Sequence, residues 1–269
     1  FDCETTGLEI DSELLGIAAV GLYSNYYLII HATYSLIKQA LTALTSSIGN
    51  LNSSHDEMKK YLVYKTANFV SAWMYGFASV IFFVLLDQFI VWWAGASYLL
   101  DRKIVIILIA NFYMLGISQI FNIFRSAFGL FVQGQLRPII SSIVNLIFSL
   151  ILVQYYGILG VFMGTAISYL SFNIWYDPYI MHKFLFKKSP IPFYVRSISY
   201  VLTTIIALVI SSIICLTFKI DIVLLNMGIN FIICFIITSI IFVIMYFQTE
   251  EFKYIMNILK FILLKIKAK

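Results

Sequence analysis

Polar and ionisable side chains recur at helical spacing inside long apolar stretches of this chain. The first stretch carries Ser24, His31, Ser35, Lys38 and Thr42, and a later one carries Asn111, Ser118, Asn122, Arg125 and Gly129. Both series follow steps of seven, four, three and four residues. On a helix that turns by about 100° per residue, each series stays within about 60° and forms one polar face.

Arg125 and Lys38 are the charged members of these faces and are candidate substrate-binding residues. A guanidinium or ammonium group at the centre of a bilayer costs about 2.5–3.5 kcal/mol. Aligned polar faces therefore predict a shared hydrated cavity. Two alternatives stay open. Ser, Thr and Asn side chains also form hydrogen bonds between helices, and Arg125 could extend from a helix end to the lipid headgroups.

Three further features suggest chemistry or packing. His31 titrates near neutral pH and is a candidate coupling residue, although a packed neutral histidine fits equally well. Asp177 precedes Pro178, which we expect to end a helix near the membrane surface, with Asp177 in a surface ion pair with Lys183 or His182. Glycines in the sequence GILGVFMGT (157–165) predict close helix packing.

The composition excludes a soluble domain. Of the 269 residues, 61% are hydrophobic and 12% are charged, and the mean hydropathy is +0.94. A soluble protein of this length needs more charge on its surface. We therefore expect an all-α polytopic membrane helical bundle. The three cysteines have no metal-ligand spacing, and we expect no metal, no cofactor and no nucleic-acid partner.

Seven membrane spans are predicted from runs of about 20 or more largely apolar residues. They cover 17–46, 61–86, 104–131, 137–156, 158–181, 196–217 and 222–247. The longest link between them is 87–103, whose Trp92, Trp93 and Tyr98 suit a membrane interface. The excess of Lys and Arg in alternate links predicts a cytoplasmic C-terminus and an N-terminus that faces outward. Residues 250–269 predict an amphipathic helix on the inner leaflet.

Several stretches, in order, resemble one family of membrane transporters. They are VGLYSNYYLII (20–30), SSIGNL (46–51), NFYM (111–114), FRSAFGLF (124–131), the segment 136–168 and WYDP (175–178). They look like the C-terminal half of the polysaccharide transporter family, which includes the O-antigen and capsule repeat-unit flippases. The family lies within the multidrug/oligosaccharidyl-lipid/polysaccharide exporter superfamily. The resemblance covers roughly residues 10–185.

The resemblance implies a flippase of the bacterial inner membrane, with no enzymatic activity. Its members export undecaprenyl-diphosphate-linked oligosaccharides by alternating access between two lobes, through a cationic cavity. Arg125 and Arg137 match basic positions of the family, and Asn145 matches an asparagine. Where the family often has glutamate before the proline, this chain has Asp177. We therefore expect Arg125, Lys38, Asn145, Asn122 and Arg137 to bind substrate.

The expected organisation has four parts. Residues 1–16 form an outer segment, 17–185 the core of the C-terminal lobe, 186–247 two further membrane helices, and 248–269 the cytoplasmic tail helix. The acidic opening, which lacks an initiator methionine, leads us to expect a preceding N-terminal lobe. The partners would be the lipid-linked oligosaccharide, membrane lipids and that lobe. The alternatives are an ion-coupled exporter of drugs or small molecules, and a membrane polysaccharide polymerase or ligase.

Overall fold

The structure is a computed structural model that describes residues 3–52, 56–217 and 220–267, and in that part of the chain helices joined by short links are present and strands are absent. The helices are α1 (Cys3–Thr42), α2 (Thr45–Asn52), α3 (Glu57–Trp93), α4 (Arg102–Ala127), α5 (Arg137–Tyr156), α6 (Ile158–Ser168), α7 (Ile174–Ile180), α8 (Ile191–Thr217), α9 (Val223–Tyr246) and α10 (Glu250–Lys267). Short 3₁₀ turns η1 (Ala96–Tyr98) and η2 (Val132–Gly134) lie in the links, and wider π-helical turns η3 (Tyr169–Asn173) and η4 (Met181–Phe186) flank α7.

Six helices in the described residues are long and apolar enough to cross a membrane. They are Glu57–Trp93, Arg102–Ala127, Val132–Tyr156, Ile158–Phe186, Ile191–Thr217 and Val223–Tyr246. The all-α prediction is thus confirmed, and the six helices indicate a protein embedded in a membrane. The remaining predicted span, 17–46, corresponds to most of α1, whose side chains up to residue 20 lie outside the described part.

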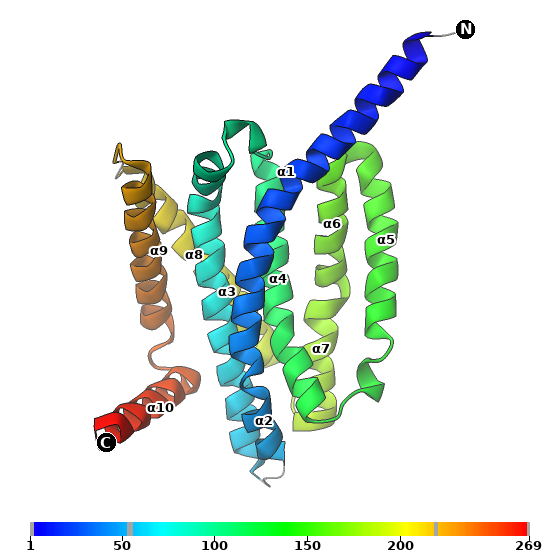
Figure 1. Ribbon diagram of the computed structural model, residues 1–269. Coiled ribbons are helices and arrows are strands. Elements are labelled where there is room, and N and C mark those ends of the chain that lie inside the picture. Colours follow the sequence, from blue (N-terminus) through cyan, green and yellow to red (C-terminus); the bar gives the residue numbers. More distant parts are fainter. Residues whose placement is uncertain (1–2, 53–55, 218–219, 268–269) are drawn as a thin grey trace.

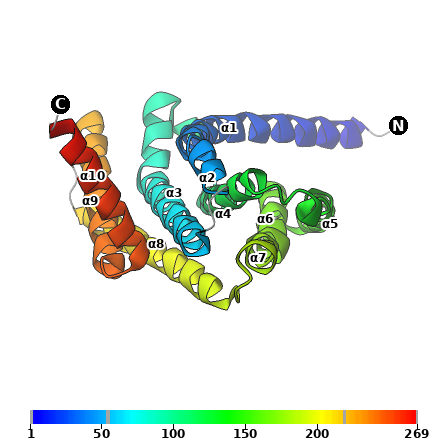
Figure 2. The ribbon, with the colours of Figure 1, turned by 90° about the horizontal axis from the view of Figure 1, so that it is seen from below.

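The long helices alternate in direction, which gathers the links at two ends (Figure 1). Seen along the bundle, α3 and α4 lie in the middle, α8 and α9 to one side, and α5, α6 and α7 to the other (Figure 2). The first half of α1 extends beyond the bundle (Figure 1). The predicted link 87–103 is shorter than expected, because α3 continues as helix to Trp93.

The core is aromatic and forms mainly between α3 and α4. Tyr64, Tyr75 and Phe124 are fully or almost fully buried there. At Gly116 on α4 an added side chain would overlap the ring of Tyr75, so only glycine lets the two helices approach this closely. A single aromatic side chain buries about 150–250 Å², and this cluster therefore contributes much of the packing energy of the bundle.

Helices α5 and α6 form a tight antiparallel hairpin, and its glycines have the packing role that the sequence predicts. A side chain added at Gly160 would overlap the backbone of Leu152, and one added at Gly164 would overlap Ser149. Gly157 turns the chain between the helices with a φ of 57°, which a residue with a side chain rarely adopts. Apart from this contact α5 is largely exposed, since only 6% of its most apolar 18-residue stretch is buried.

The prediction that Pro178 ends its helix is wrong. Pro178 lies inside α7, and the helical path continues through η4 to Phe186. Proline has no N–H to donate and clashes with the carbonyl one turn earlier in a regular α-helix. Here the π-helical turn η3 precedes it, and wider turns of this kind change the hydrogen-bond pattern around a proline. The longer helix carries Asp177 inside the bundle.

Helix α10 turns sharply away from α9 and packs its first turn against α3 (Figure 1). Lys65 Nζ lies 2.6 Å from Glu250 Oε2, and Phe252 packs against the aromatic cluster of Phe69 and Tyr246. The hydrogen bond from Lys65 and the charge of Lys65 lower the pKa of the exposed Glu250 carboxyl. The first turn of α10 is thus held by one surface ion pair and by apolar packing.

Candidate functional site

Three charged side chains from three different helices meet inside the bundle. Arg125 is in the last turn of α4, Arg137 is the first residue of α5, and Asp177 is in α7. Asp177 Oδ1 lies 3.6 Å from Arg125 Nη1, and Asp177 Oδ2 lies 3.2 Å from Arg137 Nη1. We call these three residues, with the two asparagines described next, the arginine cluster.

Two asparagine amides hold the guanidinium groups in place. The side-chain oxygen of Asn122 accepts hydrogen bonds from Arg125 Nη2 at 2.7 Å and from Arg137 Nη1 at 2.9 Å. The oxygen of Asn173 accepts from Arg137 Nε at 3.3 Å. Asn122 therefore joins both arginines through one atom, which brings two like charges close together. Such an arrangement needs negative charge nearby, and Asp177 supplies one unit of it.

The local fold explains how these side chains converge. Asn122 and Arg125 are three residues apart on α4 and share one face, while Asn173 and Asp177 are four residues apart across the junction of η3 and α7. The turn between α4 and α5 brings Gly134 against Arg125. A side chain added at Gly134 would come within 2.6 Å of Arg125 Nη1, so the glycine leaves space for the guanidinium.

The cluster is nearly dry and carries more positive than negative charge. The side chain of Asp177 is 2% exposed, that of Arg137 11% and that of Arg125 17%. Among the described residues, Arg125 Nη1 and Asp177 Oδ2 have no hydrogen-bond partner, although both lie close to opposite charges. Two guanidinium groups share one carboxylate, which leaves one excess positive charge. A second anion with several acceptor oxygens would satisfy both the excess charge and the free donor.

No family model, no curated protein and no solved structure matches the chain. In the part of the chain that the structure describes, no group of three or more His, Cys, Asp or Glu side chains could hold a metal ion.

Of the predicted substrate-binding residues, the structure brings Arg125, Arg137 and Asn122 together. Asn145 is placed elsewhere, on α5, where its amide nitrogen donates to Thr165 Oγ1 at 3.1 Å and its oxygen accepts from Ser149. The bond to Thr165 joins α5 to α6, which is the hydrogen bonding between helices that the sequence left as an alternative, and the bond from Ser149 lies within α5.

Lys38 and His31 lie on the exposed side of α1, in contact with tyrosines. The Nζ of Lys38 is 5.8 Å from the centroid of the Tyr34 ring, and the imidazole of His31 stacks on Tyr27 at 5.2 Å. Ser24 and Thr42 of the same polar face are also exposed. The first polar face therefore lies on the surface of the bundle. It is separate from the arginine cluster.

The polar face of α4 serves mainly to join helices. The Asn111 amide donates to the backbone oxygen of Phe162 at 3.0 Å, and the Ser118 hydroxyl donates to carbonyls of its own helix. On α5 and α6, which neighbour this face, the Ser141 and Ser168 hydroxyls pair at 2.8 Å. Hydrogen bonds between and within helices thus engage Asn111 and Ser118, two of the polar groups for which the sequence predicted a shared cavity. Asn122 and Arg125 are the members of this face that belong to the arginine cluster.

The sequence did not reveal the role of Asp177. The predicted surface ion pair with Lys183 or His182 is wrong, because Asp177 is buried and pairs with the two arginines. Lys183 donates instead to the Tyr179 hydroxyl, and His182 Nδ1 lies 2.7 Å from the backbone oxygen of Pro178. One signal was present: Asn173 and Asp177 are four residues apart in an apolar segment and so share a helix face.

Proposed function

We propose that the chain is part of a transporter that moves a lipid-linked oligosaccharide across the membrane, and that the arginine cluster binds the diphosphate of this cargo. The observation that supports the proposal most is the excess of positive charge in a buried site with a free guanidinium donor. Arginine is well suited to this task, since its planar fork binds phosphate oxygens in pairs. The stretches that resemble the polysaccharide transporters suggest undecaprenyl diphosphate as the lipid carrier.

Asp177 would act as the resident anion that holds the arginines between transport cycles. Because it neutralises one of the two guanidinium charges, it lowers the cost of keeping the site buried without cargo. A diphosphate carries more negative charge and more acceptor oxygens than one carboxylate. Binding of the cargo would therefore release Asp177 from Arg125 and Arg137, and the separation of α7 from α4 and α5 would accompany the change in access.

The proposed setting is a bacterial inner membrane with a cytoplasmic C-terminus. Helices α3, α5 and α8 begin at the lower end of the bundle in Figure 1, and the basic residues near these starts support this orientation, since positive charge accumulates on the cytoplasmic side. They occur where α3, α5 and α8 begin and where η4 ends, and include Lys59, Lys60, Arg137, Lys183, Lys187, Lys188 and Arg196. In this orientation the arginine cluster lies toward the cytoplasmic side, where a cargo made inside the cell would enter.

The first test measures binding of a diphosphate lipid to the purified chain in detergent. Farnesyl diphosphate is the probe, and farnesyl monophosphate and farnesol are the comparison ligands. We expect Arg125→Gln and Arg137→Gln each to weaken diphosphate binding by about tenfold or more, as removal of a charge-assisted hydrogen bond does. Arg102→Gln is the matched control, because Arg102 pairs with Asp87 at the opposite end of the bundle.

A further variant tests whether Lys38 of α1 contributes to diphosphate binding, as the sequence predicts, or whether the arginine cluster binds it alone. Lys38→Gln should leave binding unchanged if the arginine cluster alone holds the diphosphate, and should weaken it if the exposed face of α1 contributes. Binding that survives in the Arg125→Gln/Arg137→Gln double variant would refute the proposed site. In proteoliposomes that contain the protein together with its expected N-terminal lobe, the same double variant should fail to move a fluorescent diphosphate-linked lipid between leaflets, whereas the unmodified protein should move it.

An ion-coupled exporter is the second candidate, and the burial of Asp177 favours it. Membrane-embedded carboxylates commonly take part in ion pathways, and Asp177 is a carboxylate that lies 2% exposed within a predicted span. In this case Asp177→Asn should abolish the effect of a proton or sodium gradient on transport and leave diphosphate binding intact. Loss of diphosphate binding in Arg125→Gln without any change in ion dependence would exclude this alternative.

A further inference from the structure

A second basic site lies at the end of the bundle where α3, α8 and α10 meet. A pocket of about 390 Å³ opens there, and its lining includes Tyr61, Lys65 and Asn68 of α3, Lys188 of the turn before α8, Arg196 of α8, and Glu251 of α10. The left-handed conformation of Lys187, with a φ of 50°, turns the chain out of η4 and places Lys188 at the rim. Three basic residues and one acidic residue thus line the pocket.

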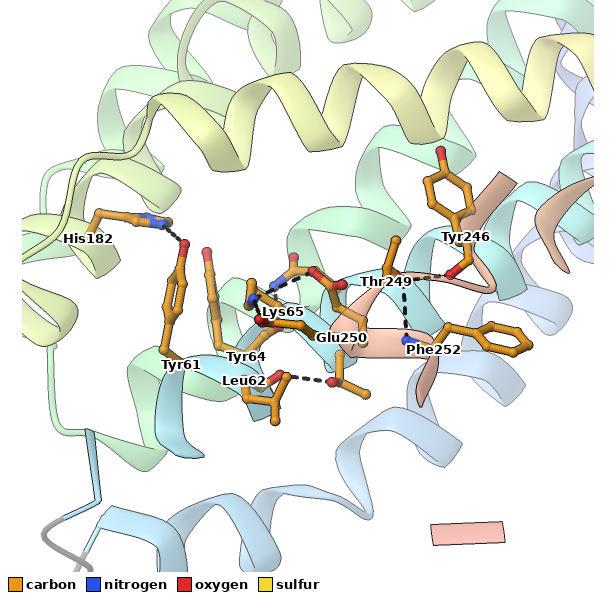
Figure 3. Close-up of polar contacts among 12 residues, drawn as sticks. Tyr61, Leu62, Tyr64, Lys65, His182, Tyr246, Thr249, Glu250 and Phe252 are labelled. Carbon is orange, nitrogen blue, oxygen red and sulfur yellow. Dashed lines mark hydrogen bonds and ion pairs between the residues drawn. The ribbon is translucent and has the colours of Figure 1, made fainter. Parts of the chain in front are cut away.

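Two of these three cations have no carboxylate partner. Lys65 is engaged, with Glu250 at 2.6 Å and Glu251 at 3.9 Å (Figure 3). By contrast, neither Lys188 nor Arg196 forms an ion pair with any described residue. Lys188 Nζ lies 4.4 Å from the centroid of the Tyr61 ring, and the guanidinium carbon of Arg196 lies 5.8 Å from that of Tyr246. Cations held over aromatic rings keep their hydrogen-bond donors free for an anion.

The pocket also holds a buried acceptor without a partner. Asn68 is 4% exposed, its amide nitrogen donates to the backbone oxygen of Tyr64, and its side-chain oxygen receives no hydrogen bond from the described residues. A buried oxygen without a hydrogen bond is unfavourable. An anion alone would not satisfy it, because an anion accepts and does not donate. A ligand that fits the whole pocket therefore needs a hydroxyl group beside its negative charge.

We propose that this pocket binds a phosphate group that has a neighbouring hydroxyl, as in the glycerol headgroup of an anionic membrane lipid. Lys188 and Arg196 bind the phosphate oxygens, and Asn68 accepts a hydrogen bond from the headgroup hydroxyl. The adjacent α10 is amphipathic, with charged residues on one face and isoleucine, leucine and phenylalanine on the other, so it suits the lipid interface. Basic pockets between membrane helices on the cytoplasmic side bind anionic lipid headgroups.

The pocket is separate from the arginine cluster, since none of the cluster residues lines it. One structural path joins the two. The Nε2 atom of His182 lies 3.5 Å from the Tyr61 hydroxyl (Figure 3). The Nδ1 atom of His182 lies 2.7 Å from the backbone oxygen of Pro178, the residue that follows Asp177. Occupation of the pocket would fix Tyr61 and the first turn of α10, and would thereby stabilise this end of α7. The proposal concerns binding alone and does not depend on transport of any cargo.

The test is a lipid titration of the purified chain in a neutral detergent, read by thermal unfolding. The probes are short-chain phosphatidylglycerol, phosphatidic acid and phosphatidylcholine, with inorganic phosphate and glycerol 3-phosphate as soluble counterparts. We expect phosphatidylglycerol to raise the melting temperature in a saturable manner and phosphatidylcholine to leave it unchanged. Lys188→Gln and Arg196→Gln should each weaken the apparent affinity about fivefold, and the double variant about twenty-five-fold.

The matched control is Lys183→Gln/Lys253→Gln, which removes the same charge from the same end of the protein without touching the pocket lining. An equal loss of phosphatidylglycerol affinity in this control and in Lys188→Gln/Arg196→Gln would overturn the proposal, because only surface charge would then be responsible. Equal stabilisation by glycerol 3-phosphate would support the phosphate site and assign it to a soluble ligand.

Asn68→Leu tests the hydroxyl contact by itself. It should weaken binding of phosphatidylglycerol and leave that of phosphatidic acid, which has no headgroup hydroxyl, within about twofold. Equal loss for the two lipids would contradict the role of Asn68.

Discussion

Asp177→Asn is the substitution that most directly tests the arginine cluster. It removes one negative charge and keeps nearly the same shape, so the packing around α7 is unchanged. Arg125 and Arg137 would then lie inside the bundle with two positive charges linked through Asn122 and with no carboxylate between them. The substitution therefore isolates the electrostatic contribution of Asp177 from its volume.

The size of the effect follows from burial. The Asp177 side chain is 2% exposed and lies 3.2 Å and 3.6 Å from the two guanidinium groups. Loss of one partner from a buried ion pair costs about 3–5 kcal/mol, because the remaining charge stays buried without compensation. In a chain of this size each kcal/mol lowers the melting temperature by roughly 2–4 °C. Asp177→Asn should therefore lower it by roughly 6–20 °C.

Thermal unfolding of the purified protein in detergent measures this loss, and Asp87→Asn is its control. Asp87 also pairs with an arginine, at 2.6 Å from Arg102, but the two side chains are 31% and 42% exposed. A partly exposed pair contributes about 0.2–1 kcal/mol, so Asp87→Asn should lower the melting temperature by no more than about 4 °C.

A double substitution distinguishes charge from other causes. Arg137→Gln/Asp177→Asn returns the cluster to one net positive charge and should recover part of the stability that Asp177→Asn loses. If Asp177→Asn melts within about 2 °C of the unmodified protein, or if the double variant is less stable than either single variant, the electrostatic reasoning is refuted.

Three further predictions concern other contacts. Gly134→Ala should displace the Arg125 guanidinium, which an added methyl would approach at 2.6 Å, and should weaken farnesyl diphosphate binding several-fold in the binding assay. Gly164→Val should lower unfolding stability by about 1–3 kcal/mol or more in a thermal melt, because α5 leaves no space there, whereas Gly228→Val on α9 meets open space and should cost much less. Because Lys65 lowers the pKa of Glu250, the ion pair stabilises the docked α10 above the ordinary pKa of 4.5 and is lost as the pH falls below that value. Hydrogen exchange of residues 250–267 should increase in that acidic range at low salt, and Lys65→Gln should remove the pH dependence.

Much of the fold could be predicted because the hydrophobic pattern in a membrane protein is long and continuous. From α3 to α9 the apolar runs placed the long helices to within several residues, whereas α1 begins at Cys3 and not at the predicted residue 17. GILGVFMGT correctly indicated close packing between α5 and α6. The ends were less predictable. Hydropathy does not show where a helix leaves the apolar layer, so the charged residue Asp87 seemed to end α3, which continues to Trp93.

The site was predictable only in part, because helical periodicity describes one helix at a time. It placed Asn122 and Arg125 on a common face, and the family resemblance added Arg137. It could not show which other helix supplies the counter-charge, since Asp177 and Arg125 are 52 residues apart in the chain. Because proline usually ends a helix, we predicted that the helix ends at Pro178 and that Asp177 lies at the surface. The π-helical turns around it, which no simple pattern reveals, carry it inside.

Because of those π-helical turns, the direction of the Asp177 side chain depends on how far α7 is rotated about its helix axis. A turn that holds one extra residue can revert to regular α-helix, and every residue beyond it then rotates by about 100° and shifts by about 1.5 Å along the axis. With η3 before Asp177 and η4 after it, this short stretch can rotate while the helices on either side stay in place. A rotation of that size would swing the carboxylate off the guanidinium groups. The π-helical and α-helical forms of the turn would thus place the Asp177 carboxylate in two different positions, one against the arginines and one away from them.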